Sequence, residues 1–196
     1  MLPVKPTARF ARFVSWIGHP LVFVTISVGI VVTTQLTSSA AIPILAALFL
    51  SVIVPTAVLL VAGVRSGRWQ DADVSVREER KRFYPWAIPF STLGTLVTWL
   101  IRAPFFVVRG GLVTLALFVA AAVVNFWLKI SLHTLFASYC TTVLFRVNAL
   151  CGTVAFILAG LVFWSRLFLS RHTLLEVVAG VGLGVSGGII AAWWPL

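Results

Sequence analysis

Charged residues are scarce in this sequence. They make up 10% of its 196 residues and only five of them are acidic, while hydrophobic residues make up 60% and the mean hydropathy is +1.07. A soluble domain of this size would need far more charge to cover its surface. The composition therefore excludes an ordinary water-soluble fold and predicts a membrane protein, which we expect to form a single membrane domain over residues 1–196.

Cysteine is also rare, and acidic residues are outnumbered. Cys140 and Cys151 both lie in apolar stretches and are expected to pack between helices rather than form a disulfide or a metal site. The net charge of +10 would point to nucleic acid in a soluble chain. Here the basic residues lie almost entirely in gaps between apolar runs, as in membrane loops that face anionic lipid. We therefore expect membrane lipids, and no nucleic acid, as partners.

Long apolar runs are what the sequence has in abundance. A membrane-spanning helix needs about 20 mostly apolar residues, and shorter runs can be tilted or partly reentrant. We expect an all-α, polytopic transmembrane bundle of about 6–7 helices, the first an uncleaved membrane helix rather than a signal peptide. A basic segment (1–19) precedes it, and a basic loop (65–85) follows the second window. The windows are Pro20–Leu36, Ala40–Gly63, Trp86–Ile101, Leu112–Leu128, Leu132–Phe145, Val147–Trp164 and Thr173–Trp194.

The basic residues predict an orientation. If all seven windows span the membrane, one face collects the N-terminus with Lys5, the loop 65–85 and the gaps 129–133 and 165–172. That face carries 12 of the 15 Lys and Arg residues. The positive-inside rule makes it cytoplasmic. We expect an integral protein of a prokaryotic cell membrane with its active site on this face.

The gap between the last two windows holds the sharpest polar pattern. It reads Ser165-Arg166, five residues, His172, three residues, Glu176. His172 and Glu176 lie four apart at the start of a helix, so both project from one side. The carboxylate can fix the imidazole tautomer, and the other ring nitrogen can then act as nucleophile or base. Arg166 offers a planar donor fork for phosphate oxygens, although a salt-bridged helix entrance is the plainer alternative.

Two earlier gaps contribute further polar residues. In the gap Lys129-Ile130-Ser131-Leu132-His133, a helix N-terminus and two donors can receive an anion, and His133 can protonate a leaving oxygen. The loop 65–85 supplies Arg77, Arg80 and Arg82 before Pro85. These arginines can bind phosphate, or the loop can simply be solvated and lie against lipid head groups. Asp71 and Asp73 in the same loop form a single acidic pair, which is too little for a metal–diphosphate site.

Together the three gaps resemble the type 2 phosphatidic acid phosphatase superfamily, whose motifs are K-x6-R-P, P-S-G-H and S-R-x5-H-x3-D. The resemblance covers roughly residues 71–180. The third motif matches in spacing at Ser165, Arg166 and His172, with Glu176 where the family has Asp. The second keeps Ser131 and His133, with Ile130 for Pro and Leu132 for Gly. The first is the loosest, because Pro85 comes later than in the family.

The resemblance implies a metal-independent lipid phosphatase without a cofactor. His172 would attack phosphorus to form a phosphohistidine, Glu176 would orient it, and His133 would protonate the leaving alcohol. The remaining residues would stabilise the phosphoryl oxygens; they are Arg166, Ser165, Ser131, Lys129, Arg77, Arg80 and Arg82.

The substrate is expected to be an isoprenoid or glycerolipid phosphate or diphosphate. The main alternative is a protein that binds or transports a lipid phosphate without turnover. A vanadate-dependent haloperoxidase fits poorly with so apolar a chain, and a prenyl-transferring enzyme would depend on magnesium.

Overall fold

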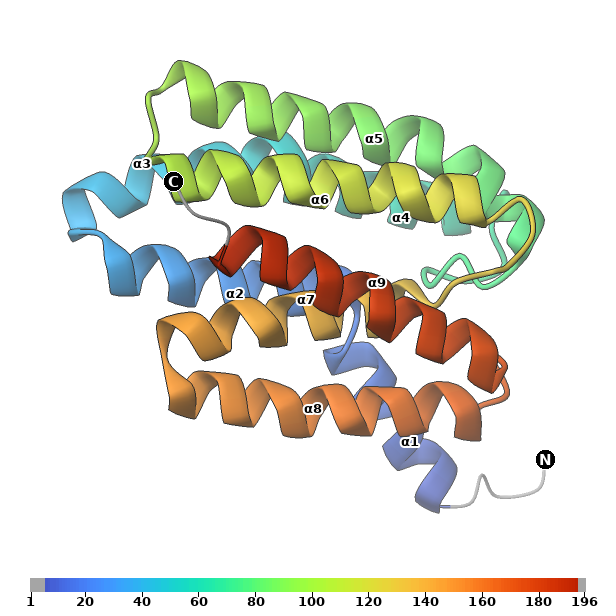
Figure 1. Cartoon of the computed structure of the whole chain (residues 1–196). Coiled ribbons are helices and arrows are strands. Elements are labelled where there is room, and N and C mark those ends of the chain that lie inside the picture. Colours follow the sequence, from blue (N-terminus) through green and yellow to red (C-terminus); the bar gives the residue numbers. More distant parts are fainter. Residues whose placement is uncertain (1–5, 194–196) are drawn as a thin grey trace. The chain divides into compact units, whose positions relative to one another are not determined.

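The computed structural model describes residues 6–193, so Lys5 and Trp194 lie outside the described residues. The described chain is all-helical, without a strand (Figure 1). This confirms the all-α prediction. The elements are α1 (Pro6–Ile17), α2 (Pro20–Gln35), α3 (Ser38–Leu48), the π-helix η1 (Phe49–Ile53), α4 (Val54–Arg65), α5 (Arg77–Leu100), α6 (Phe105–Val124), α7 (Leu132–Val147), α8 (Ala149–Phe168) and α9 (Leu174–Trp193).

Each of the seven apolar windows overlaps a helix. The segments α3, η1 and α4 follow one another without a break and correspond to one window, Ala40–Gly63. The helix α1 was not predicted, because the sequence before Pro20 contains no apolar run of spanning length. One side of this helix is buried and carries Ala11, Val14 and Ser15. The rest is exposed and mixes Arg9 and Arg12 with Phe10 and Phe13.

Within residues 6–193, four helices are long and apolar enough to cross a membrane. They are the continuous helix Ser38–Arg65, then α6, α8 and α9; the pair α1 and α2, bent by 51°, makes a fifth if it counts as one span. Only 17% of the most apolar window in Ser38–Arg65 and 33% of that in α9 are buried. Apolar side chains left exposed on this scale need an apolar solvent. The helices therefore indicate a membrane protein, and the larger count of spans stays a prediction.

Prolines explain the two main irregularities of these helices. Pro20 begins α2, and a residue before proline disfavours helical geometry, so the chain breaks at Gly18-His19 between α1 and α2. The π-helix η1 ends two residues before Pro55. Proline has no N–H for the carbonyl four residues earlier and clashes with it, and a wider π turn accommodates this conflict.

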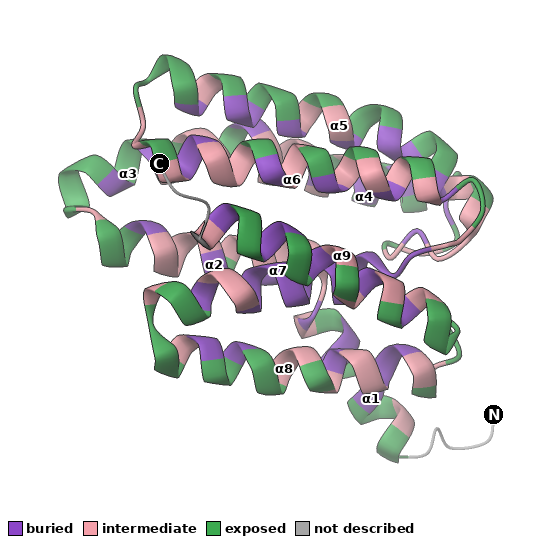
Figure 2. Cartoon of the chain, in the orientation of Figure 1, coloured by how far each residue is buried: buried purple, intermediate pink, exposed green. Residues whose placement is uncertain are grey.

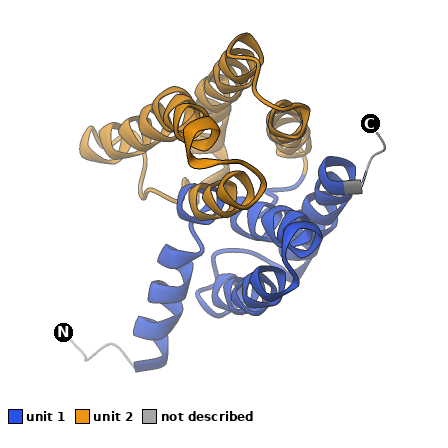
Figure 3. Cartoon of the chain, turned by 90° about the vertical axis from the view of Figure 1, so that its left-hand side faces the viewer, with its two compact units in different colours: residues 1–24, 128–196 blue, residues 25–127 orange. Residues whose placement is uncertain are grey.

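The chain divides into two compact units, drawn in different colours in Figure 3. One unit combines residues 1–24 with 128–196, and the other contains residues 25–127. The first unit therefore joins α1 to α7, α8 and α9, and the second contains α3 to α6. In the second unit a small core forms around Val32, Ala41, Ile44 and Val107.

The helix α7 is the buried centre of the first unit, and it is mostly purple in Figure 2. It packs closely against α9 because three glycines of α9, spaced four apart, face it. A Cβ on Gly184 would lie 2.1 Å from the carbonyl oxygen of Leu135, and one on Gly180 would lie 2.7 Å from that of Ser131. Small residues at this spacing let membrane helices approach at backbone distance. Gly188 continues the row, with a Cβ position 2.5 Å from Thr142 Cβ.

Candidate functional site

One polar contact of the predicted site joins His172 to Glu176. The Nδ1 atom of His172 and the Oε2 atom of Glu176 are 2.8 Å apart. His172 is 7% exposed and lies two residues before α9 begins at Leu174, so the contact joins the segment before the helix to its first turn rather than two residues of one helix. The contact that the sequence predicted is therefore present, and it directs Nε2 of the ring to the side opposite Glu176.

Glu176 also caps its own helix. The backbone N–H of Thr173 donates to the same Oε2 atom at 3.1 Å. The Thr173 hydroxyl accepts from the backbone N–H of Glu176 at 3.4 Å. Thr173 and Glu176 thus form a capping box at the start of α9. A glutamate at this position reaches back to the cap residue, so Glu176 stabilises the start of α9.

The end of α8 brings Ser165 and Arg166 to the same region. Both side chains are fully buried, at 0% exposure. Ser165 Oγ donates to the carbonyl of Val162 at 2.8 Å, so its hydroxyl hydrogen is bound within α8 in this structure. Arg166 Nη1 donates to Ser15 Oγ of α1 at 2.6 Å. The guanidinium is thereby held by a residue that the sequence analysis did not single out.

The turn from α8 to α9 is tight. Ser170 has a φ of 52°, in the left-handed region that most residues avoid. The backbone N–H of Arg171 donates to the carbonyl of Arg166 at 3.1 Å. These features reverse the chain within a few residues and bring His172 back to the start of α9.

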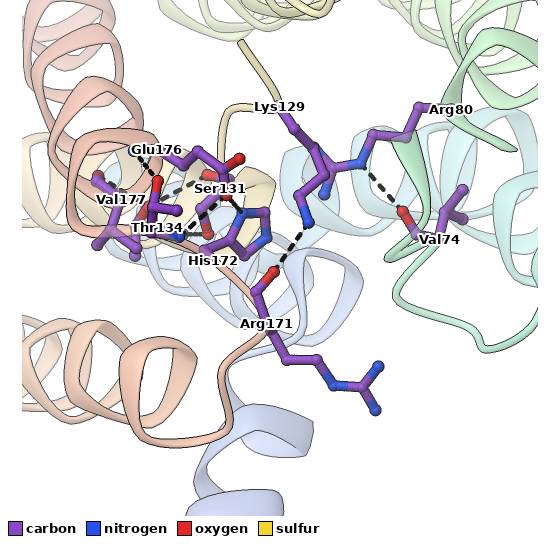
Figure 4. Close-up of polar contacts among 10 residues, drawn as sticks. Val74, Arg80, Lys129, Ser131, Thr134, Arg171, His172, Glu176 and Val177 are labelled. Carbon is purple, nitrogen blue, oxygen red and sulfur yellow. Dashed lines mark hydrogen bonds and ion pairs between the residues drawn. The ribbon is translucent and has the colours of Figure 1, made fainter. Parts of the chain in front are cut away.

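The start of α7 lies directly against the start of α9, as Figure 4 shows for Ser131, Thr134, His172 and Glu176. The backbone N–H of Ser131 donates to the carbonyl of Glu176 at 3.1 Å, and Thr134 Oγ1 lies 3.2 Å from the carbonyl of Val177. Ser131 is the N-cap of α7 and accepts from the Thr134 N–H. The two predicted motifs, far apart in sequence, therefore meet at two helix N-termini.

Two further predicted residues lie in this unit. His133 sits in the first turn of α7 and is 2% exposed. Lys129 donates from Nζ to the carbonyl of Arg171 at 2.9 Å (Figure 4), which ties the segment before α7 to the turn before α9. Seven of the ten predicted site residues thus belong to one compact unit; they are Lys129, Ser131, His133, Ser165, Arg166, His172 and Glu176.

The arginines of the first gap belong to the other unit and differ in their surroundings. Arg77 donates from Nε to the carbonyl of Asn125 at 2.8 Å and from Nη2 to that of Phe126. Arg80 is 1% exposed and donates from Nε to the carbonyl of Val74 at 3.0 Å. Arg82 is exposed. Arg77 and Arg80 therefore stabilise the local structure by binding backbone carbonyls of neighbouring segments.

The acidic pair of the first gap shapes its loop. Asp71 accepts hydrogen bonds from the backbone N–H and the hydroxyl of Ser75, four residues later, and its carbonyl accepts from the backbone N–H of Val74 at 3.2 Å. The turn holds Val74 at a φ of 47°, an uncommon conformation for a β-branched residue. Among the described residues, no group of three or more His, Cys, Asp or Glu side chains is arranged to hold a metal ion.

Two residues of the N-terminal segment, Ser15 and His19, contact predicted site residues although no sequence pattern indicates it. Ser15 holds Arg166, as described above. The ring of His19 packs edge-on against that of His133, with centroids 5.4 Å apart and an interplanar angle of 86°. His19 is the one histidine of the three that was not predicted as a site residue, and it lies in the break before Pro20. A histidine beside a helix break is a weak signal, and only the packing of α1 on α8 reveals its neighbour.

The unit that contains this site has a strong excess of basic residues. Glu176 is the only acidic residue in 1–24 and 128–196, and its carboxylate faces His172 and Thr173. The same segments contain seven Lys and Arg residues. This basic excess, together with the fully buried guanidinium of Arg166, favours an anionic ligand. Comparison of the chain with family models, curated proteins and solved structures found no match.

Proposed function

We propose that this protein is a membrane phosphatase that hydrolyses a lipid phosphate or diphosphate, isoprenoid or glycerolipid, through a metal-independent phosphohistidine intermediate. One observation carries the proposal: the 2.8 Å contact between His172 and Glu176 at the start of α9, with Arg166 buried one tight turn before it. The motif resemblance to the type 2 phosphatidic acid phosphatases supports the same roles.

In the first step the lone pair on Nε2 of His172 attacks phosphorus. A P–N bond forms as the bond from phosphorus to the ester oxygen breaks, and the electron pair leaves with that oxygen. His133 donates a proton to the leaving oxygen. Glu176, bound to Nδ1, stabilises the positive charge that the imidazole gains.

In the second step water attacks the phosphorus of the phosphohistidine. His133, now neutral, takes a proton from the water, and the P–N bond breaks with its electron pair returning to His172. Inorganic phosphate leaves, and both histidines regain their starting states. The enzyme needs no redox partner and no external nucleophile besides water.

Charge stabilisation would come from donors that surround the phosphoryl oxygens. Arg166 supplies a rigid guanidinium, and the N-termini of α7 and α9 supply backbone dipoles. Ser131 and Lys129 stand beside them. In phosphoryl transfer such positioned charge accounts for most of the rate gain.

A lipid substrate follows from the location that the proposal gives to the site. The helices α8 and α9 are both long and apolar enough to cross a membrane. Arg166 lies in the last turn of α8, and His172 lies just before α9 begins. A phosphate bound between them would sit at the membrane boundary with its tail in the apolar layer. The basic excess of the same gaps favours the cytoplasmic face.

The test is phosphate release by the detergent-purified protein. The panel comprises phosphatidic acid, phosphatidylglycerol phosphate, polyprenyl phosphate, polyprenyl diphosphate and a short-chain soluble phosphate, each with EDTA present. Release that persists in EDTA and is lost in His172→Ala supports the proposal, provided Arg171→Ala, an exposed residue of the same turn, remains active. No release from any substrate by folded protein contradicts it.

A second candidate function is binding or transport of a lipid phosphate without turnover. Two observations favour it: the Ser165 hydroxyl donates to a helix carbonyl, and buried Ile130 and Leu132 flank Ser131 where the family has Pro and Gly. Saturable binding of a lipid phosphate without release of phosphate would identify this function.

A further inference from the structure

The N-terminal helix α1 packs against α8 through a face of small residues. Ala11, Val14 and Ser15 are buried, and Gly18 follows on the same side one turn later. A Cβ on Gly18 would lie 2.1 Å from Val162 Cγ2, so the close approach of the two segments requires glycine there. This packing fixes where the side chains of the N-terminal segment reach.

Ser15 reaches the guanidinium of Arg166. The distance from Arg166 Nη1 to Ser15 Oγ is 2.6 Å, and both residues are buried. A hydrogen bond with a charged donor is short and strong. Because an arginine carries a planar fork of donors, a bond to one nitrogen also sets the direction in which the others point.

His19 reaches the ring of His133. Its Nδ1 atom accepts from the backbone N–H of Leu21 at 3.3 Å, which fixes the ring at the start of α2. The ring then meets His133 nearly at right angles, with centroids 5.4 Å apart. Edge-to-face packing of this kind restricts the orientation of the partner ring.

We propose that the N-terminal segment is part of the phosphate site, with Ser15 and His19 as positioning residues. Ser15 aims the guanidinium of Arg166, and His19 holds the imidazole of His133. The inference rests on the proposed function, since it assigns both residues to that same reaction. It goes beyond the motif resemblance, which begins near residue 71 and includes no residue of this segment.

The first experiment compares Ser15→Ala with the wild type for hydrolysis of the best lipid phosphate. If Ser15 aims Arg166, kcat/KM falls roughly 10–100-fold, the range found where a residue that orients a functional side chain is removed. Ser15→Thr retains a hydroxyl and is expected to recover most of the loss. The matched control is Ser51→Ala, because Ser51 is also buried but donates only to the carbonyl of Ala47.

A double-mutant cycle separates positioning from simple packing. If Ser15 acts through Arg166, the double variant with Ser15→Ala and Arg166→Lys is no worse than Arg166→Lys alone. Independent, additive losses would overturn the inference for Ser15. An unchanged kcat/KM in Ser15→Ala, with the protein folded, would overturn it as well.

For His19, the informative variant is His19→Asn. Asparagine can still accept from the N–H two residues on, so the start of α2 keeps its partner while the ring against His133 is lost. We expect kcat to fall with little change in KM, and His19→Phe to recover part of kcat by restoring an aromatic edge. Equal kcat in all three proteins would overturn the role of His19.

The failure of this inference differs from the failure of the proposed function. A wild type that hydrolyses lipid phosphate while Ser15→Ala and His19→Asn do so equally well removes only the positioning roles. A wild type without turnover removes the proposed phosphatase. Binding of inorganic phosphate then tests Ser15 alone: weaker binding by Ser15→Ala than by Ser51→Ala supports its effect on Arg166, and equal or absent binding overturns it.

Discussion

The carboxylate of Glu176 lies 2.8 Å from Nδ1 of His172, and the same oxygen accepts the backbone N–H of Thr173 at 3.1 Å. One oxygen therefore serves two purposes, orientation of an imidazole and capping of α9. The two purposes can be separated by mutation, because Thr173 takes part only in the cap.

We predict that Glu176→Gln lowers kcat by roughly 100-fold or more, the scale of a lost acid–base partner. Glutamine can still cap the helix but cannot stabilise an imidazolium. Thr173→Ala is the matched control: it should cost about 1 kcal/mol of stability, as lost N-caps do, and leave kcat within a few-fold. Steady-state kinetics beside thermal unfolding in detergent measures both, and equal kcat losses would mean that Glu176 acts only as a cap.

Arg166 and Arg171 offer a comparison within one turn of chain. Arg166 is fully buried with a side-chain partner, whereas Arg171 is exposed and its carbonyl accepts from Lys129. Arg166→Lys should lower kcat/KM by roughly 100–1,000-fold, as removal of one donor to a developing charge does, because lysine has no planar fork. Arg171→Lys should change it little, and the reverse ranking would contradict this site.

The glycine row of α9 predicts a stability difference between neighbouring positions. Gly184→Ala forces a Cβ to within 2.1 Å of a backbone oxygen, so it should destabilise the protein by about 1–3 kcal/mol, as overpacking does. Gly182→Ala meets nothing within 4 Å and should be neutral or stabilising by up to about 1 kcal/mol, from helix propensity. Thermal unfolding of both variants in the same detergent is the measurement. Equal midpoints would show that α7 and α9 do not depend on this contact.

In the other unit, replacing buried Arg80 should lower the stability of the protein more than replacing exposed Arg82. Arg80→Ala leaves the carbonyl of Val74 without its buried donor and should cost about 1–3 kcal/mol. Arg82 is exposed, so Arg82→Ala should stay within about 0.5 kcal/mol. Denaturation curves of the two variants test this, and similar stability losses would contradict a structural role specific to Arg80.

The helices were largely predictable because length and hydropathy dominate in an apolar chain. Each window of about 20 residues corresponds to a helix, and a spacing of four placed Glu176 beside His172. The helix α1 was not predicted because it is short and contains Arg9 and Arg12. These two charges interrupt its apolar residues, so no long apolar run marks the helix. The π turn before Pro55 depends on how one carbonyl is accommodated, which composition does not express.

A contact of the candidate site was predictable where its residues, His172 and Glu176, are close in sequence. The site's contacts across the chain were not. Nothing in the order of residues indicates that Ser15 meets Arg166, 151 positions later, or that the backbone of Ser131 meets that of Glu176. Those contacts follow from the approach of α1 to α8 and of α7 to α9, which glycines permit at Gly18 and Gly184.

The most direct test of the central claim is to trap the covalent intermediate. Purified protein is mixed briefly with the best lipid phosphate, quenched in alkali, digested and analysed by mass spectrometry, with His172→Ala beside it. We predict one phosphoryl group on His172, labile to acid and absent from the variant. Substrate turnover with no phosphoryl group on His172, or with the group on another residue, would contradict the mechanism proposed for this protein.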